Sequence, residues 1–204
     1  LGSGEITSSL VLQEKKITAE VCVHHLSLND TYYPKKQSLI KCNPAIKSEK
    51  DQAALWHALN NDYFDIIATD HAPHTWDEKM NDYLDAPSGL PLVQHSLQLM
   101  IEHVKSGKIT IEKMIQKMCH APAQLFNINK RGFLREGYFA DIVIINPETQ
   151  EIVTKNNIHY KCGWSPFEGE RFTSSIDHTI ISGHMAFSKG KFDETRLGHR
   201  LTFN

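Results

Sequence analysis

The chain has 204 residues, with 22 basic and 24 acidic side chains and a formal net charge of −2. This length is enough for a sizeable core and corresponds to one or two domains. There is no extended basic patch and no apolar run of membrane-spanning length, so we expect neither nucleic-acid binding nor a membrane-spanning helix. The first residues, LGSGEITSS, lack a signal-peptide pattern and are typical of a cut end.

The cysteines are spaced too widely for a compact metal or disulfide motif. There are four of them and no CxxC pair: Cys22, Cys42, Cys119 and Cys162. This spacing argues against a zinc knuckle or a dense disulfide framework and predicts a reducing, cytoplasmic location.

The first third of the chain alternates strand-like and helix-like segments. Short strands are predicted over 16–23, 38–42 and 64–69. A helix is predicted over 48–62, where Ser48 and Asp51 have the spacing of a capping box. A repeat of strand, loop, helix and strand is typical of a parallel α/β sheet or barrel.

The rest of the chain divides near Asn129. Helical spacing continues over 93–104 and 111–118, and Pro122 is placed to open a short helix. From Lys130 onward, glycine turns surround β-branched runs such as DIVII. We therefore predict part of an α/β barrel, with its last three strands and their helices, over 1–129 and a small composite β domain with a tail over 130–204.

Polar side chains follow each of the three predicted strands. They are His24, His25, Asn43, Asp70, His71 and His74. In a (β/α) barrel, the carboxyl ends of the strands form the face on which the active site is assembled. The sequence therefore predicts a site at this edge.

The residue types suggest distinct roles at that site. Asp70 could ligate a divalent cation and also transfer a proton, and His25 could supply an imidazole ligand for zinc. Asn43 can both donate to and accept from an amide or imide substrate. His74 follows Asp70 by four residues across a proline-containing loop, which suits substrate contact better than sharing the metal.

Simpler interpretations apply to several of these residues. Asp70 could be a turn carboxylate, and one of His24 and His25 is expected to be structural because adjacent strand residues face opposite ways. His71 is expected to support the loop. Glu78 and Lys79 are interpreted as a solvated charge pair.

Five segments resemble dihydroorotase, a cyclic amidohydrolase of pyrimidine biosynthesis. IATDHAPH followed by EK is similar to the eighth-strand motif, and TAEVCVHHL is similar to the usual TAEVTPHHL of the sixth strand. KCNPAIK, GFLREGYFADIVIINP and GWSPFEG resemble later segments of the family. The resemblance implies an α/β fold, namely the C-terminal part of a (β/α)8 barrel with a small C-terminal β domain.

The resemblance also implies a chemistry. A binuclear zinc site would supply a hydroxide that attacks the ring amide, in the reversible cyclisation of N-carbamoyl-L-aspartate to dihydroorotate. His25 matches the sixth-strand zinc ligand, and Asp70 matches the eighth-strand ligand that also serves as general acid/base. Asn43 and His74 match substrate-binding positions.

Other parts of the family pattern are missing from the chain. The HxH pair of the first strand, the bridging ligand of the fourth strand and the fifth-strand histidine are absent, and GSGEITSS occupies the place expected for a fifth-strand HxST segment. We therefore expect a fragment that is inactive alone, lacks the N-terminal half of the barrel and belongs to a homo-oligomer. The alternatives are another cyclic amidohydrolase of the allantoinase or hydantoinase type, and a catalytically dead dihydroorotase-like scaffold for a partner enzyme such as aspartate transcarbamoylase.

Overall fold

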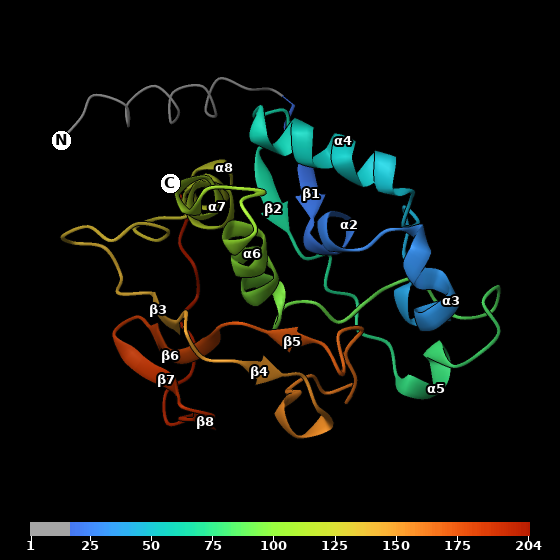
Figure 1. Ribbon diagram of the computed structural model, residues 1–204. Coiled ribbons are helices and arrows are strands. Elements are labelled where there is room, and N and C mark those ends of the chain that lie inside the picture. Colours follow the sequence, from blue (N-terminus) through green and yellow to red (C-terminus); the bar gives the residue numbers. More distant parts are fainter. Residues whose placement is uncertain (1–16) are drawn as a thin grey trace.

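A computed structural model describes residues 17–204, and the GSGEITSS segment lies outside them. Two short parallel strands, β1 (Glu20–Cys22) and β2 (Ile66–Ala68), lie side by side among the helices of the first region (Figure 1). Their register places Glu20 beside Ile66 and Cys22 beside Ala68. Because the strands are parallel, their carboxyl ends lie at the same edge of the pair, and the predicted site residues follow there.

Short helices and helical turns surround this strand pair. They are α2 (Val23–Ser27), η1 (Asp30–Tyr32), α3 (Tyr33–Lys36), η2 (Gln37–Ile40), α4 (Glu49–Asn60), α5 (Trp76–Lys79), α6 (Ser96–Lys105), α7 (Ile111–Ile115), η3 (Gln116–His120) and α8 (Ala121–Leu125). The capping box predicted for α4 is confirmed, because the Ser48 hydroxyl accepts from the Asp51 N–H and the Asp51 carboxylate accepts from the Ser48 N–H. Pro122 lies in the first turn of α8, as predicted.

Two local predictions were wrong. The strand predicted over 38–42 is instead the 3-10 turn η2, which closes with a hydrogen bond of 3.0 Å from the Lys41 N–H to the Ser38 carbonyl. The turn satisfies its backbone locally, while the Ser38 hydroxyl donates to the Lys79 carbonyl. His24 and His25 follow β1, as predicted, but they lie in the helix α2, so the expectation based on strand alternation was wrong.

The main core lies between the strand pair and the helices. Val21, Leu26, Leu59 and Met100 are almost fully buried there. Trp56 of α4 packs in the same cluster, and its indole N–H donates to the Leu26 carbonyl over 3.0 Å. This packing fixes α2 and its two histidines relative to α4.

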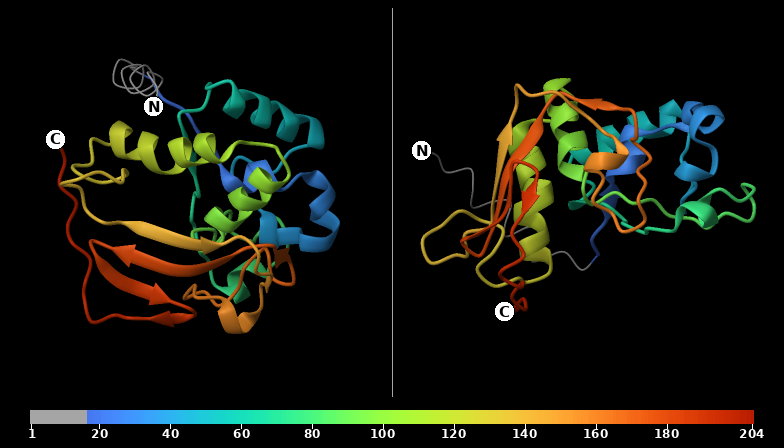
Figure 2. Two further views of the ribbon diagram at one scale, coloured as in Figure 1. Left: turned by 60° about the vertical axis from the view of Figure 1, so that its left-hand side comes forward. Right: turned by 90° about the horizontal axis from the view of Figure 1, so that it is seen from below.

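The C-terminal region is dominated by an antiparallel sheet (Figure 2). Its strands run in the order β3 (Ile142–Asn146), β6 (Ser175–Ile181), β7 (His184–Ser188) and β8 (Lys191–Phe192). A separate antiparallel pair joins β4 (Glu151–Ile152) to β5 (Arg171–Phe172), and η4 (Lys155–Asn157) follows β4. The β-branched run DIVII does form a strand, as predicted.

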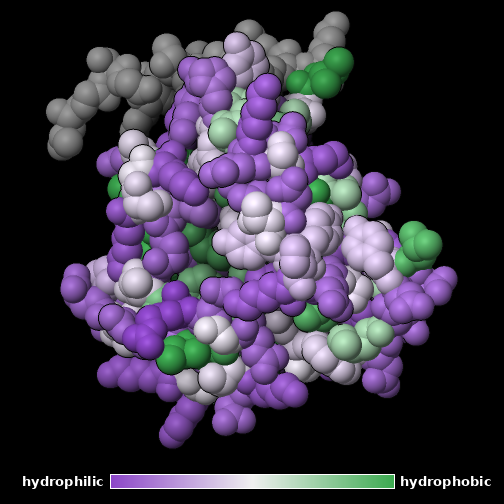
Figure 3. Space-filling model, turned by 45° about the vertical axis from the view of Figure 1, so that its right-hand side comes forward, coloured by the Kyte–Doolittle hydropathy of each residue, from purple (hydrophilic) through white to green (hydrophobic). Residues whose placement is uncertain are grey.

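The second region also contributes to the core of the first. Val153, Phe167 and Phe172 pack in the same buried cluster as the helices. The boundary near Asn129 stays a prediction. Hydrophilic side chains dominate the face shown in Figure 3, with hydrophobic ones in small scattered groups. Within residues 17–204, every helix is too short or too polar to cross a bilayer.

Candidate active site

Asp70 lies just beyond the carboxyl end of β2. It is exposed, and its φ of 47° places it in the left-handed region, which reverses the chain after the strand. The pKa of Cys22 is raised to about 12 and that of Cys42 to about 11, mainly by burial, and the nearby Asp70 carboxylate contributes to both increases. Asp70 is therefore near both thiols, one at the end of β1 and the other just after η2.

His25 follows β1 in the first turns of α2 and contacts the segment after η2. Its Nε2 lies 2.9 Å from the Pro44 carbonyl, so this nitrogen carries the hydrogen and donates it. Nδ1 is then the nitrogen available to a metal. Asn43, which precedes Pro44, is exposed at the same edge.

His24 is fully buried beside His25. The two ring centroids are 4.1 Å apart, and neither ring nitrogen of His24 has a hydrogen-bond partner. Burial and, to a smaller extent, the adjacent His25 lower the pKa of His24 to about 3. The ring is therefore neutral at ordinary pH, which is the form that ligates metals.

One group of three metal-ligating side chains occurs within residues 17–204. Cys22, His24 and His25 each offer one ligand atom, and these atoms lie within 4.8 Å of one another. Thiolate and imidazole groups suit zinc and other transition metals, and the unpartnered nitrogens of His24 fit such a group. The predicted pair of His25 and Asp70 is not joined by a third ligand into such a group. Sequence reasoning missed Cys22, although its place in TAEVCVHHL, where threonine is usual, was a visible signal.

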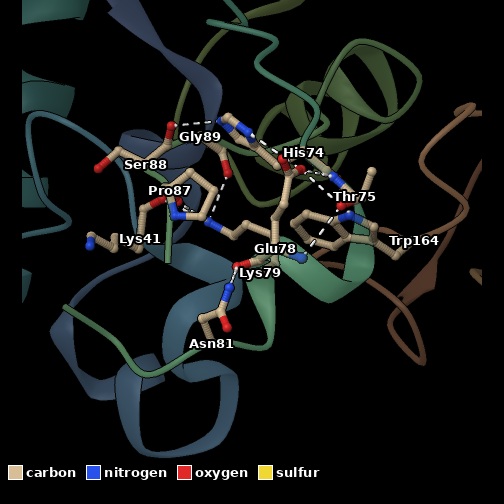
Figure 4. A network of polar contacts seen from close by, with 10 residues as sticks. All are labelled: Lys41, His74, Thr75, Glu78, Lys79, Asn81, Pro87, Ser88, Gly89 and Trp164. Atoms are coloured by element: carbon tan, nitrogen blue, oxygen red, sulfur yellow. Dashed lines mark hydrogen bonds and ion pairs between the residues drawn. The ribbon is translucent and has the colours of Figure 1, made fainter. Parts of the chain in front are cut away.

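His74 is held by the loop that follows Asp70. Its Nε2 donates to the Ser88 carbonyl over 3.1 Å, and its own carbonyl accepts from the Trp164 indole N–H over 2.8 Å (Figure 4). It lines a cavity of about 350 Å³ together with His71, Pro73, Thr75, Tyr160, Lys161 and Cys162. His74 therefore faces space that a small molecule could enter.

His71 ties the same loop to the start of the next segment. Its Nδ1 accepts from the Leu92 N–H over 3.0 Å and lies 3.4 Å from the Val93 nitrogen. With Nδ1 accepting, Nε2 carries the hydrogen of the neutral ring. Burial lowers the pKa of His71, which favours that neutral form.

The interpretation of Glu78 and Lys79 as a solvated charge pair was wrong. The Glu78 carboxylate accepts from the Thr75 N–H over 2.7 Å and from its hydroxyl over 2.8 Å, which forms the capping box of α5. Lys79 has no exposed surface, and burial lowers its pKa to about 8. Its Nζ donates to backbone carbonyls rather than to Glu78 (Figure 4).

Comparison with known proteins identifies the family. The model of the "Amidohydrolase family" matches residues 6–186. The chain belongs to the amidohydrolase family. Amidohydrolases are generally metal-dependent hydrolases, and the group of Cys22, His24 and His25 provides side chains able to hold a metal ion.

Curated relatives of this amidohydrolase chain include several dihydroorotases. It is 36% identical to the dihydroorotase of Clostridium acetobutylicum over 84% of its own length and 40% of the relative's. It is 33% identical to that of Pyrococcus furiosus over 91% of its length and 43% of the relative's. The multifunctional protein pyr1-3 of Dictyostelium discoideum is 37% identical over 86% of this chain and 8% of that protein. The chain thus spans less than half of these relatives.

Solved structures confirm the expected fold class. L-hydantoinase from Arthrobacter aurescens superposes with a TM-score of 0.83 at 24% identity, covering 90% of this chain and 43% of that one. D-hydantoinase from Thermus sp. gives a TM-score of 0.80 at 22% identity, covering 89% and 41%. The amidohydrolase chain therefore has the α/β fold predicted for the C-terminal part of these enzymes.

Proposed function

We propose that this chain is the C-terminal portion of a dihydroorotase, which interconverts N-carbamoyl-L-aspartate and dihydroorotate. The observation that carries the proposal is the 33–37% identity to proteins named dihydroorotase or pyr1-3. It is supported by the DHAPH loop after β2, in which hydrogen bonds hold His71 and His74. The hydantoinases share the fold at 24% identity or less, which supports the hydantoinase alternative less strongly.

The proposed metal is zinc, and two ions are expected in the complete enzyme. His25 would ligate through Nδ1, because its Nε2 is bonded to the Pro44 carbonyl. Asp70 would be the second ligand from this chain, and its carboxylate is exposed and makes no hydrogen bond within residues 17–204, so it can approach a metal freely. Bound zinc would supply Lewis-acid activation of water and of the ring amide.

The chain's own residues would move the proton and orient the substrate. Asp70 takes a proton from the attacking water during ring opening and returns it to the ring nitrogen that leaves when the C–N bond breaks, as a general base and then a general acid. Asn43 donates to and accepts from the imide edge of the ring. His74 donates to the substrate carboxylate, a charge-assisted hydrogen bond that replaces its bond to Ser88.

The remaining ligands would come from the part of the enzyme that this chain does not span. We therefore propose that the isolated chain is inactive and that the N-terminal half of the barrel completes the site. Assembly as a homo-oligomer and a cytoplasmic location stay predictions from the sequence. The expected partner is a small-molecule substrate, with no nucleic acid or membrane involved.

The test compares this chain alone with the protein that contains it. Ring opening of dihydroorotate should be measured with zinc for both, and allantoin and hydantoin should be offered to the longer protein. We expect turnover of dihydroorotate by the longer protein only. Preferred turnover of allantoin or hydantoin would contradict the substrate assignment, and a longer protein that is inactive on all three substrates would favour the scaffold alternative.

A further inference from the structure

A buried lysine links the segments that carry the proposed substrate contacts. The ammonium group of Lys79 donates to the carbonyl oxygens of Lys41 over 3.2 Å, Pro87 over 2.9 Å and Gly89 over 3.0 Å (Figure 4). We call these three acceptors the Lys79 carbonyl cluster. An ammonium group has three N–H donors, and here each one has a carbonyl acceptor.

The charge of Lys79 is not balanced by a carboxylate. Two other buried lysines in the described part of the chain have acidic partners, Lys36 with Glu170 at 3.0 Å and Lys117 with Asp62 at 2.8 Å. No ion pair of Lys79 occurs within residues 17–204. A buried cation without a counter-ion is costly, and an apolar side chain would fill the same space at lower cost. The geometry therefore indicates that the carbonyl contacts themselves are what Lys79 contributes.

Two of the three acceptors lie close in sequence to residues that form or contact the proposed site. Lys41 is two residues before Asn43, which precedes the Pro44 carbonyl that fixes His25. Gly89 follows Ser88, whose carbonyl accepts from His74. The Gly89 N–H also donates to the Lys41 carbonyl over 2.9 Å, so the two segments contact each other as well as Lys79.

The backbone at Gly89 packs closely against the loop that follows Asp70. A Cβ added at Gly89 would lie 2.7 Å from the Ala72 carbonyl oxygen and 3.1 Å from His74 Cδ2. A shift of the 87–89 backbone would therefore displace His74. Because Lys79 has no exposed surface, it acts through these backbones and does not touch the substrate.

We propose that Lys79 is a positioning residue that holds the Asn43 and His74 segments in register through the Lys79 carbonyl cluster. The inference rests on the proposed dihydroorotase function, because that function assigns Asn43 and His74 to substrate binding. It adds a buried group that determines substrate affinity without belonging to the site.

The experiment uses the complete protein that contains this chain. Lys79→Met removes the charge and the three donors while it retains most of the side-chain length. Lys36→Met is the matched control, because Lys36 is also buried but donates to Pro166 and Glu170. The measurements are kcat and KM for dihydroorotate, and amide hydrogen exchange in peptides covering 41–44 and 87–89.

We expect Lys79→Met to raise KM roughly tenfold or more with a smaller change in kcat, because misplaced contacts weaken binding of the substrate. Exchange in both peptides should accelerate together. Lys79→Arg, which keeps the charge, should restore part of the affinity, whereas Lys36→Met should leave KM and both peptides unchanged.

An unchanged KM and unchanged exchange in Lys79→Met would overturn the proposal, as would equal effects of Lys36→Met. A wild-type protein without dihydroorotase activity would instead contradict the proposed function. The exchange measurement would then still decide whether Lys79 holds the two segments.

Discussion

The helical region around β1 and β2 differs from the C-terminal sheet in how deeply its polar side chains are buried. The first region buries His24 and Lys79 completely, and it ends two parallel strands at one edge. In the sheet of β3, β6, β7 and β8, no residue is classed as buried, and Val143 and Ile144 remain more than 40% exposed. Burying polar groups is costly, so their concentration in the first region marks the part of the fold shaped by function.

The second region contributes to the site at one place. The segment between β4 and β5 carries Trp164, which donates to the His74 carbonyl. Phe167 of the same segment packs in the main core. The C-terminal region thus has two parts. The four-stranded sheet lies away from the proposed site, whereas the segment between β4 and β5 supports that site.

The largest expected effect is on catalysis, from Asp70→Asn in the complete protein. The amide keeps the size of the side chain but cannot act as a general base, so kcat for dihydroorotate should fall by about 10²–10⁴-fold. Asp82→Asn is the control, because Asp82 is also an exposed aspartate outside the proposed site. Activity of Asp70→Asn within a few fold of wild type would remove Asp70 from the mechanism, provided that the circular dichroism spectra match.

The next effect concerns acid stability. The pKa of His24 is lowered to about 3 and that of His95 to about 4, in both cases mainly by burial. Between about pH 4 and 6.5 the unfolded chain binds more protons than the folded chain, so stability should fall as the pH drops through this range. At pH 5 each histidine should cost about 2 kcal/mol relative to pH 7.

Urea unfolding at pH 7, 6 and 5 measures this dependence. His24→Gln and His95→Gln should each make the free energy of unfolding less sensitive to pH. His199→Gln, at an exposed position in the C-terminal tail, should not. If His199→Gln flattened the dependence as much as His24→Gln, the buried histidines would not be its source.

A further stability prediction compares two glycines with positive φ, one in each region. Gly89→Ala introduces a Cβ 2.7 Å from two atoms of Ala72, whereas Gly183→Ala in the β6–β7 hairpin meets nothing within 4 Å. Both substitutions are strained, and Gly183→Ala should cost about 1 kcal/mol of unfolding free energy. Gly89→Ala should cost roughly 2 kcal/mol more because the Asp70–His74 loop must also move. If urea unfolding gave equal losses of unfolding free energy for the two variants, the Asp70–His74 loop would move at little energetic cost.

Sequence patterns predicted the parts of the fold that depend on local chemistry. The capping box at Ser48, the strand Ile142–Asn146 and the strand before Asp70 all follow from spacing and residue type. The prediction of a strand over 38–42 was wrong because these residues form the 3-10 turn η2. The turn is held partly by a hydrogen bond from the Ser38 hydroxyl to the carbonyl of Lys79, which is distant in sequence. A pattern of hydrophobicity carries no information about such a partner.

The site could be predicted only in outline for the same reason. Asp70, His74, Asn43 and His25 stand in recognisable motifs, and their roles stay predictions. The full burial of Lys79 and the Trp164 contact to His74 depend on segments that are distant in sequence. Lysine beside glutamate usually indicates a solvated pair, and only the tertiary structure shows that Glu78 caps α5 while Lys79 points inward.

The smallest expected effect tests whether the connecting segment supports the site. Trp164→Phe removes the indole N–H that donates to the His74 carbonyl but keeps an aromatic ring in the buried position. Loss of one hydrogen bond to a partly buried carbonyl should lower the free energy of unfolding by about 1–2 kcal/mol. It should also raise KM for dihydroorotate, because His74 loses one of its two fixed contacts.

Phe187→Leu in the remote sheet is the comparison, and it should affect stability without affecting KM. A change in KM for Phe187→Leu as large as that for Trp164→Phe would show that the two regions cannot be separated in this way.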